Sequence, residues 1–386
     1  MLITKRGLIA GPALAAVLAV TPASTVVAAP KAAVKSGSLN GYLSGVACPR
    51  ANDCWAVGSQ EPAGVHGVYT ILIERWNGSR WRVATSSGAA LKDAALSAVS
   101  CASTSSCWAV GAAALGTTKH EPITEHWNGR KWSLTVLAEP AGTTDAALFG
   151  VSCPTAARCW AAGAVNPGTR AAKALVEHWT GKRWSVVRAA APVAGTILAA
   201  VSCRRDTNCW AVGNGAPNAP AEHWNGKKWS LATTPGTGGG LNAVSCPGTD
   251  CFAVGEDGFP GQLAERWNGS RWSVMRTQQA STFAAGFDGV SCITSSGCFA
   301  VGRSFKTHFG SESSRALVER LRGSAWVIVR SPNPAGAGLV FLNGVACTSA
   351  RACWAVGEHA KNLSGAPTRT LAERWNGTRW SIVPTP

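Results

Sequence analysis

One stretch decides the fold: LAAVSCRRDTNCWAVGNGAPNAPAEHWNGKKWS, from Leu198 to Ser230, occurs seven times in related form along the 386-residue chain. A copy has a short apolar segment that ends at a cysteine, a polar loop and the motif C-W-A-V-G. After a variable connection, most copies continue with E-[HR]-W-N-G and a further tryptophan. The copies begin near residues 43, 96, 148, 198, 241, 287 and 342. A period of roughly 50 residues predicts an array of repeated units, of the propeller or solenoid kind.

All 14 cysteines occupy two positions of the repeat. The pairs are Cys48 and Cys54, Cys101 and Cys107, Cys153 and Cys159, Cys203 and Cys209, Cys246 and Cys251, Cys292 and Cys298, and Cys347 and Cys353. An even number of cysteines at a fixed spacing predicts disulfides outside the cytoplasm. Zinc is the alternative, but zinc pairs normally use C-x2–4-C with two further ligands; six pairs here are C-x5-C, only Cys246 and Cys251 are C-x4-C, and the two further ligands are absent. We therefore expect no metal and no other cofactor.

The N-terminus predicts export. Lys5 and Arg6 precede an apolar run, Leu8–Val20, and small residues continue to Ala29, as in a secretory signal peptide. We assign residues 1–29 to this signal, 30–40 to a flexible leader and 41–386 to one folded domain. An uncleaved membrane anchor is the alternative, although the run is short for a bilayer span. The expected location is extracellular, with cell-wall association left open and no membrane span after cleavage.

Each copy contains the signals of four short strands. The segments L-x-x-V-S-C, C-W-A-V-G, A-L-V-E-H-W and W-S-V-V are apolar and β-branched, and Asn-Gly between the last two is a strong hairpin signal. Four antiparallel strands per unit predict an all-β, single seven-bladed propeller with one hairpin disulfide in each blade. Either a two-residue type I′ turn or a four-residue turn puts Trp76 and Trp81 on one face. We expect such pairs to pack between blades; carbohydrate stacking is the alternative.

A glutamate followed by His or Arg recurs in every copy. The glutamates are Glu74, Glu125, Glu177, Glu222, Glu265, Glu319 and Glu373. One Glu-His pair suggests acid–base chemistry, but seven equivalents around a ring suggest a repeated bond to the backbone of a neighbouring blade. No catalytic residue is assigned.

Ligand recognition is expected in the variable connections between the second and third strands and between blades, because rigid scaffolds carry function on variable loops. The unrepeated polar residues that we select there are His66, Tyr69, His120, Glu121, Lys306, His308, Glu358 and His359. The opposite face carries the Cys loops and the basic Asn-Gly turns. Its candidate polyanion rim consists of Arg80, Arg130, Lys131, Lys182, Arg183, Lys227, Lys228, Arg271 and Arg379. Ordinary solvated surface is the alternative for both sets.

The copies resemble known propeller repeats. C-W-A-V-G followed by E-R-W-N-G-S-R-W is similar to the repeat of photosystem II assembly-factor-type propellers, and Gly78-Ser79-Arg80-Trp81 is similar to the end of the sialidase Asp-box. Trp76 stands where that box has its aspartate, so Asn77 is expected to shape the turn. The pattern is most similar to uncharacterised secreted actinobacterial proteins with W-N-G-x-x-W repeats. The resemblance covers about Leu43–Val383 and implies a fold; the arginine motif of sialidases is absent.

Composition and motifs narrow the function. The chain has 46% hydrophobic residues, 15% charged residues and a net charge of +16, which is typical of a basic globular domain. No P-loop, dinucleotide fingerprint, serine elbow or zinc-protease motif is present in the sequence. We predict a monomeric, non-enzymatic binding or scaffold module for an extracellular polymer or protein, without nucleic acid. The alternatives are a sialidase-like glycoside hydrolase or lyase over the central channel, favoured by clustered unrepeated carboxylates, and a purely structural wall protein.

Overall fold

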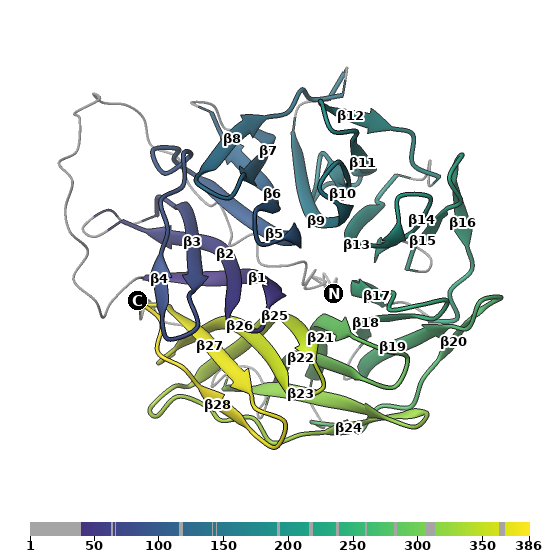
Figure 1. Cartoon of the computed structure of the whole chain (residues 1–386). Coiled ribbons are helices and arrows are strands. Elements are labelled where there is room, and N and C mark those ends of the chain that lie inside the picture. The colour runs from purple at the N-terminus through teal and green to yellow at the C-terminus, as the bar shows by residue number, and fades with distance from the viewer. Residues whose placement is uncertain are drawn as a thin grey trace, which may run out of the picture.

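The computed structural model describes residues 40–62, 65, 67–115, 119–140, 142–143, 145–190, 194–215, 219–236, 239–258, 261–281, 284–305, 313–362 and 367–386. In these residues the chain forms seven four-stranded antiparallel blades around a central axis (Figure 1). The predicted all-β, seven-bladed propeller is confirmed. The predicted signal peptide and all of the leader except Asn40 lie outside the described residues.

Strand bounds follow the repeat. Blades one and two contain β1 (Asn40–Arg50), β2 (Asp53–Glu61), β3 (Thr70–Trp76), β4 (Trp81–Val83), β5 (Ala94–Ser103), β6 (Ser106–Ala114), β7 (His120–Trp127) and β8 (Trp132–Val136). Blades three and four contain β9 (Ala146–Thr155), β10 (Arg158–Val165), β11 (Lys173–Trp179), β12 (Trp184–Val187), β13 (Ile197–Arg205), β14 (Asn208–Asn214), β15 (Ala221–Trp224) and β16 (Trp229–Ala232). Blades five and six contain β17 (Gly240–Ser245), β18 (Cys251–Asp257), β19 (Gly261–Trp267), β20 (Trp272–Val274), β21 (Ala284–Cys292), β22 (Cys298–Phe305), β23 (Ser314–Arg322) and β24 (Ala325–Ile328). Blade seven contains β25 (Leu339–Ser349), β26 (Ala352–Ala360), β27 (Arg369–Trp375) and β28 (Trp380–Ile382).

The first strand of each blade lies nearest the axis and the fourth lies at the periphery (Figure 1). The ring closes where β1 pairs with β27 at Asn40 and Arg369. The amide N–H of Gly41 donates to the carbonyl of Thr368 at 2.8 Å, and the amide of Thr368 donates to Oδ1 of Asn40 at 2.8 Å. All four strands of blade seven come from the C-terminal copy, so closure uses packing and this short pairing rather than a shared strand.

A β-bulge explains the repeated glycine of C-W-A-V-G. In blade one, Leu43 pairs with Gly58 and Gly45 pairs with Val57, which leaves Ser44 as the bulged residue. A Cβ on Gly58 would lie 2.0 Å from the carbonyl oxygen of Tyr42, and the equivalent glycines of the other blades are equally close to the first strand. No larger residue fits where the two backbones approach this closely.

The seven disulfides are confirmed. Each bond joins the first and second strands of one blade at the cysteine pairs given above, except that Cys246 of blade five directly follows β17. The structure contains no free cysteine within the described ranges, which include all 14.

The Asn-Gly turns have four residues, and the two-residue type I′ alternative is wrong. Trp76 pairs directly with Trp81, and the same register recurs in the other blades. Gly78 has φ +95°, whereas Asn77 is not in the left-handed region. Instead, Oδ1 of Asn77 accepts hydrogen bonds from the amides of Ser79 and Arg80, both at 3.1 Å. The asparagine side chain therefore shapes the turn, as expected from the missing Asp-box aspartate.

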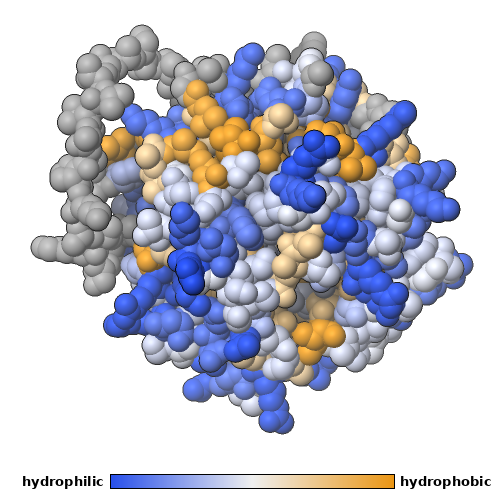
Figure 2. Space-filling model, turned by 45° about the horizontal axis from the view of Figure 1, so that its top comes forward, coloured by the Kyte–Doolittle hydropathy of each residue, from blue (hydrophilic) through white to orange (hydrophobic). Residues whose placement is uncertain are grey.

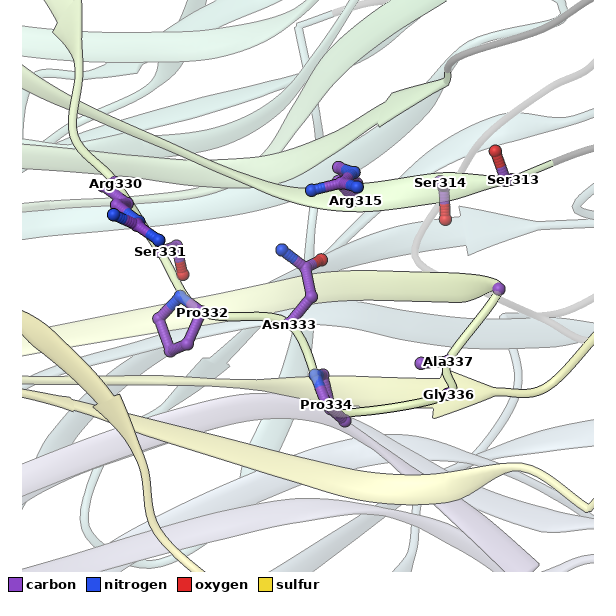
Figure 3. Close-up of a pocket in the computed structure, with 11 residues that line it drawn as sticks. Ser313, Ser314, Arg315, Arg330, Ser331, Pro332, Asn333, Pro334, Gly336 and Ala337 are labelled. Carbon is purple, nitrogen blue, oxygen red and sulfur yellow. The ribbon is translucent and has the colours of Figure 1, made fainter.

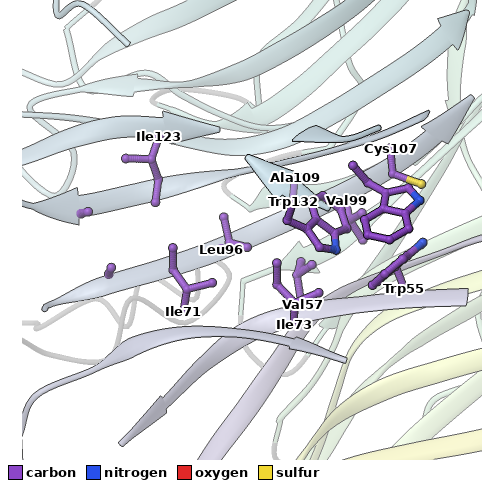
Figure 4. Packing of buried hydrophobic residues seen from close by; sticks show 13 residues of the cluster. Trp55, Val57, Ile71, Ile73, Leu96, Val99, Cys107, Ala109, Ile123 and Trp132 are labelled. Atoms are coloured by element: carbon purple, nitrogen blue, oxygen red, sulfur yellow. The ribbon is translucent and has the colours of Figure 1, made fainter. Parts of the chain in front are cut away.

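The repeated tryptophans form the junctions between blades, as predicted. The ring of Trp160 in β10 lies 4.7 Å from Trp224 and 5.4 Å from Trp229 of blade four, measured between centroids. The same contact joins Trp55 to Trp127 and Trp132, Trp108 to Trp179 and Trp184, Trp210 to Trp267 and Trp272, Phe252 to Trp326, Phe299 to Trp375 and Trp380, and Trp354 to Trp76 and Trp81. Figure 4 shows one junction, where Trp55 and Trp132 lie beside Val57, Ile73 and Val99.

Serine hydroxyls add a second link between blades. The amide of Cys203 in β13 donates to Oγ of Ser152 in β9 at 2.9 Å. Equivalent bonds join Cys153 to Ser100, Cys246 to Ser202, Cys292 to Ser245, and Cys347 to Ser291. This explains the serine of V-S-C, which links the inner strands at five of the seven junctions; copies one and seven have Ala47 and Ala346 at this position.

Candidate ligand-binding face

The repeated Glu-His and Glu-Arg pairs are part of the scaffold. The second member of each pair covers the aromatic ring of its own second strand: His178 stacks on Trp160 at 3.9 Å, and the guanidinium of Arg75 lies 4.9 Å from the Trp55 ring. The other members make the same contact: His126 with Trp108, His223 with Trp210, Arg266 with Phe252, Arg320 with Phe299 and Arg374 with Trp354. These contacts give the second member of all seven pairs a packing role in the scaffold.

The seven repeated glutamates are buried at the blade junctions. The amide of Gly88 donates to Glu125 at 3.0 Å, that of Ala190 to Glu222 at 2.8 Å, and that of Gly236 to Glu265 at 2.9 Å. Each donor lies in the connection from the preceding blade, so the predicted bond to a neighbouring backbone is confirmed for these three. Burial raises the pKa of Glu74 and Glu373 to about 8.

Four charged residues and one tyrosine that are not part of the repeat lie in blades five, six, seven and one, on the side of the variable connections. We call Glu256, Asp288, Arg303, Glu358 and Tyr42 the mouth cluster. Nη1 of Arg303 in β22 lies 2.6 Å from Oδ2 of Asp288 in β21, and Nη2 lies 3.0 Å from Oε1 of Glu256 in β18. Three blades therefore contribute side chains to one charged group around Arg303 once Glu358 of β26 is included.

Burial tunes the acidity of this cluster. It raises the pKa of Glu358 to about 7, which the positive charge of Arg303 opposes and the negative charge of Asp288 increases. The pKa of Glu256 is raised for the same reasons. Burial raises the pKa of Tyr42 to about 12, and the rings of Tyr42 and Tyr69 lie 6.4 Å apart. The site thus holds carboxyl groups that take up a proton more readily than free side chains, beside a fixed guanidinium.

Members of the cluster lie against the neighbouring blade, and a glycine makes room for one of them. Glu256 occupies the position directly after C-W-A-V-G, and its carboxylate lies against the Cα of Gly286 in the next blade, where a Cβ would meet Oε1 at 2.4 Å. Arg303 has the same position in blade six and lies over the Phe341 ring of blade seven, 5.8 Å from its centroid. Side chains at the position directly after C-W-A-V-G therefore contact the neighbouring blade in blades five and six.

The sequence-predicted ligand residues are only partly brought together. Tyr69 lies beside Tyr42, and Glu358 belongs to the mouth cluster. His120 and Glu121 lie in β7 of blade two, where the amide of His120 donates to Asp145 at 2.9 Å. His359 is half-buried in β26. The remaining three, His66, Lys306 and His308, lie outside the described residues.

All nine residues of the candidate polyanion rim are exposed on or beside the Asn-Gly turns: Arg80, Arg130, Lys131, Lys182, Arg183, Lys227, Lys228, Arg271 and Arg379. Gly78 of one such turn lies near Asn52 of a Cys loop, so these turns and the Cys loops share a face. Figure 2 shows hydrophilic side chains spread over the visible surface, with hydrophobic patches between them.

Sequence reasoning missed Glu256, Asp288, Arg303 and Tyr42 as a group. A signal existed at the residue after C-W-A-V-G, which is Ser59, Ala112, Ala164, Asn214, Glu256, Arg303 and Glu358 in the seven copies. The position becomes charged only in blades five to seven. Asp288 could be noticed as the bulged residue of β21, where no other copy has an acidic side chain.

Comparison with known proteins identifies the fold and no family. No protein-family model matches the chain, and no curated protein sequence matches it. Solved structures that it resembles include YCF48 bound to D1 peptide, with TM-score 0.52, 12% identity and coverage of 87% of this chain and 94% of that one. The RRP9 WD40 repeats give TM-score 0.55, 10% identity and coverage of 91% and 96%, and U3-55K gives 0.53, 10%, 83% and 89%. The likeness to YCF48 agrees with the predicted resemblance at the level of the fold.

Two absences hold for the described residues. No group of three or more His, Cys, Asp or Glu side chains among them is arranged to hold a metal ion. The same residues include no helix long and apolar enough to cross a membrane.

Proposed function

We propose that this chain is an extracellular, non-enzymatic binding propeller that engages a glycan, another polymer or a protein through its variable-loop face. The observation that carries the proposal is the contrast between two kinds of position. Repeated residues form the junctions, disulfides and turns, whereas the mouth cluster occurs once: hydrogen bonds join its members in blades five and six, and Glu358 of blade seven interacts electrostatically with Arg303 and with Tyr42 of blade one. Unrepeated polar groups on a rigid scaffold are where recognition is expected.

Two further observations support this role. Seven disulfides, one per blade, suit a protein that works in an oxidising compartment outside the cytoplasm. The likeness to YCF48, solved in complex with a peptide, supports a binding role for this kind of scaffold.

The test is a glycan, polyanion and peptide array probed with the purified chain at low and high salt. A shaped site on the variable-loop face predicts retention of one ligand class that survives high salt. Binding through the polyanion rim would be weakened by salt, because exposed charges are screened. Replacing Lys227 and Lys228 by Glu therefore leaves the salt-resistant binding unchanged. No retained ligand at either salt concentration, or loss of binding in this variant, contradicts the proposal.

A second function is favoured by one specific observation. Glu256 and Asp288 contact the same guanidinium, and burial raises the pKa of the nearby Glu358 to about 7. Carboxyl groups of different acidity at one site are the equipment of a glycoside hydrolase. The retained glycan is incubated with the chain and its reducing ends are measured. Release that disappears in Glu358→Gln supports the hydrolase, and an intact glycan removes it.

A further inference from the structure

A polar cavity lies on the variable-loop face of blade six and shares no lining residue with the mouth cluster. Its volume is about 420 Å³, within the usual range for small-molecule sites. Residues from the start of β23 and from the segment between β24 and β25 line it, among them Ser313, Arg315, Arg330, Ser331 and Asn333 (Figure 3). In the view of Figure 3, Ser331 and Asn333 lie between the two arginines.

The cavity wall is held in place by hydrogen bonds. Oγ of Ser314 donates to the carbonyl of Val340 at 3.0 Å and accepts from its amide at 2.9 Å, which ties the start of β23 to blade seven. Oδ1 of Asn333 accepts from the amide of Ala316 at 3.0 Å. This bond uses the acceptor of Asn333, so its amide nitrogen is left as a donor.

The charge of the cavity is positive. Arg315 and Arg330 are both exposed and have no carboxylate partner among the described residues. None of the residues that line the cavity is Asp or Glu. Ser331 donates to the buried carboxyl group of Glu373, whose pKa burial raises to about 8, so this group does not offset the arginines near neutral pH.

The arginine pair is not part of the repeat. Arg315 lies four residues before the repeated glutamate, and Arg330 lies four residues after the last tryptophan of its copy. No other copy has arginine at both positions; the nearest equivalent is Lys173 with Arg188 in blade three. Because repeated residues build this scaffold, an unrepeated pair of unpaired guanidiniums in a cavity is better explained by a ligand than by folding.

We propose that this cavity binds the carboxylate of an acidic sugar in an extracellular polysaccharide, an inference that rests on the proposed function and names its ligand class. Arg315 and Arg330 bind the carboxylate, since guanidinium–carboxylate hydrogen bonds are charge-assisted and directional. Ser313 and the amide of Asn333 complement sugar hydroxyls. The lining is polar rather than apolar or aromatic, and the volume suits one or two sugar rings, which favours a saccharide over a hydrophobic ligand.

Titration calorimetry of the full chain tests this assignment. The probe is a tetrasaccharide that alternates glucuronic acid with N-acetylglucosamine, compared with its carboxyl-reduced neutral form and with a tetra-aspartate peptide. The wild type binds the acidic tetrasaccharide at least tenfold more tightly than either comparison ligand. The double variant Arg315→Gln/Arg330→Gln loses at least ~30-fold in affinity, because a hydrogen bond to a charged group contributes roughly a factor of 10 to 100.

Two matched variants control for net charge. Lys227→Gln/Lys228→Gln removes two positive charges from the turn face, and Lys173→Gln/Arg188→Gln removes two from the equivalent positions of blade three. Each changes the affinity less than threefold, and all variants keep the wild-type melting temperature because the replaced side chains are exposed. Equal losses in all three double variants overturn the proposal, as does equal binding of the neutral saccharide or preference for the peptide.

The array and the calorimetry separate two failures. A chain that retains some ligand on the array at high salt but ignores the acidic tetrasaccharide refutes the cavity assignment and leaves the binding function standing. A chain that retains nothing on the array and binds no probe refutes both.

Discussion

Trp160→Ala tests whether aromatic junctions between blades determine stability. Trp160 is completely buried, its ring contacts Trp224 and Trp229 of blade four, and it stacks on His178 of its own blade. Its Nε1–H also donates to Oδ1 of Asp206 at 3.0 Å. Truncation therefore opens a cavity at the junction and removes a hydrogen bond.

The expected loss in free energy of unfolding is about 3–5 kcal/mol, the usual cost of truncating a buried tryptophan to alanine. Urea unfolding of the oxidised chain, monitored by circular dichroism, measures this value. Circular dichroism is used because tryptophan fluorescence would change with the number of tryptophans. The midpoint falls while the dependence on urea stays the same, because the surface exposed on unfolding hardly changes.

Trp160→Phe is the control, since blades five and six carry Phe252 and Phe299 at this position and keep the junction contact. It retains an aromatic ring but loses the hydrogen bond to Asp206, so we expect a loss of about 1–2 kcal/mol. A Trp160→Ala variant within 1 kcal/mol of the wild type would refute the junction as a main source of stability.

Three other predictions concern the repeated elements. Burial raises the pKa of Glu74, Glu373, Glu177, Glu265 and Glu319 to about 7–8 in the folded chain, against roughly 4.3 when unfolded. Their contribution to stability is therefore full below about pH 4.5 and is lost as pH rises to about 8. Urea midpoints should fall over this pH range, and midpoints that rise contradict the burial argument. In Glu74→Gln the midpoint should fall less steeply with pH. Gly181→Val should cost about 1–3 kcal/mol because Gly181 has φ +89°, whereas Gly248→Ala, with open space around it and ordinary φ, should leave the melting temperature unchanged. Peptide mapping without reductant should recover seven disulfides, each within one copy, and any bond between copies would disprove the hairpin assignment.

The repeated features were predictable because repetition multiplies a weak signal. One pair of closely spaced cysteines could belong to a metal site or a redox centre, but seven pairs at a constant repeat position, six of them C-x5-C and one C-x4-C, predict a structural bond. The Trp76 and Trp81 pair illustrates the limit of this reasoning. Alternation along a strand places both rings on one face for either turn length, so the pattern predicted the junction and left the turn open. The strand register and the hydrogen bonds of Asn77 in the structure distinguish the four-residue turn.

The mouth cluster could not be assembled from the sequence in the same way. Glu256 and Arg303 are 47 residues apart in the chain, and they meet because adjacent blades place the same repeat position side by side. The contact also requires glycine at position 286, because a Cβ there would collide with the carboxylate of Glu256. No sequence motif indicates this requirement. Glu358 and Tyr69 are recognisable in the sequence as unrepeated polar residues near the variable connections, whereas no motif marks Glu256 and Arg303, which lie within β18 and β22.

The most direct test of the binding account is hydrogen exchange, read by mass spectrometry, with and without the ligand that the array retains at high salt. The account predicts slower exchange in the variable connections and adjoining strand ends of blades five to seven and one. It predicts no change at the Asn-Gly turns that carry Lys227 and Lys228. Protection confined to those turns, or the absence of any retained ligand, would contradict it.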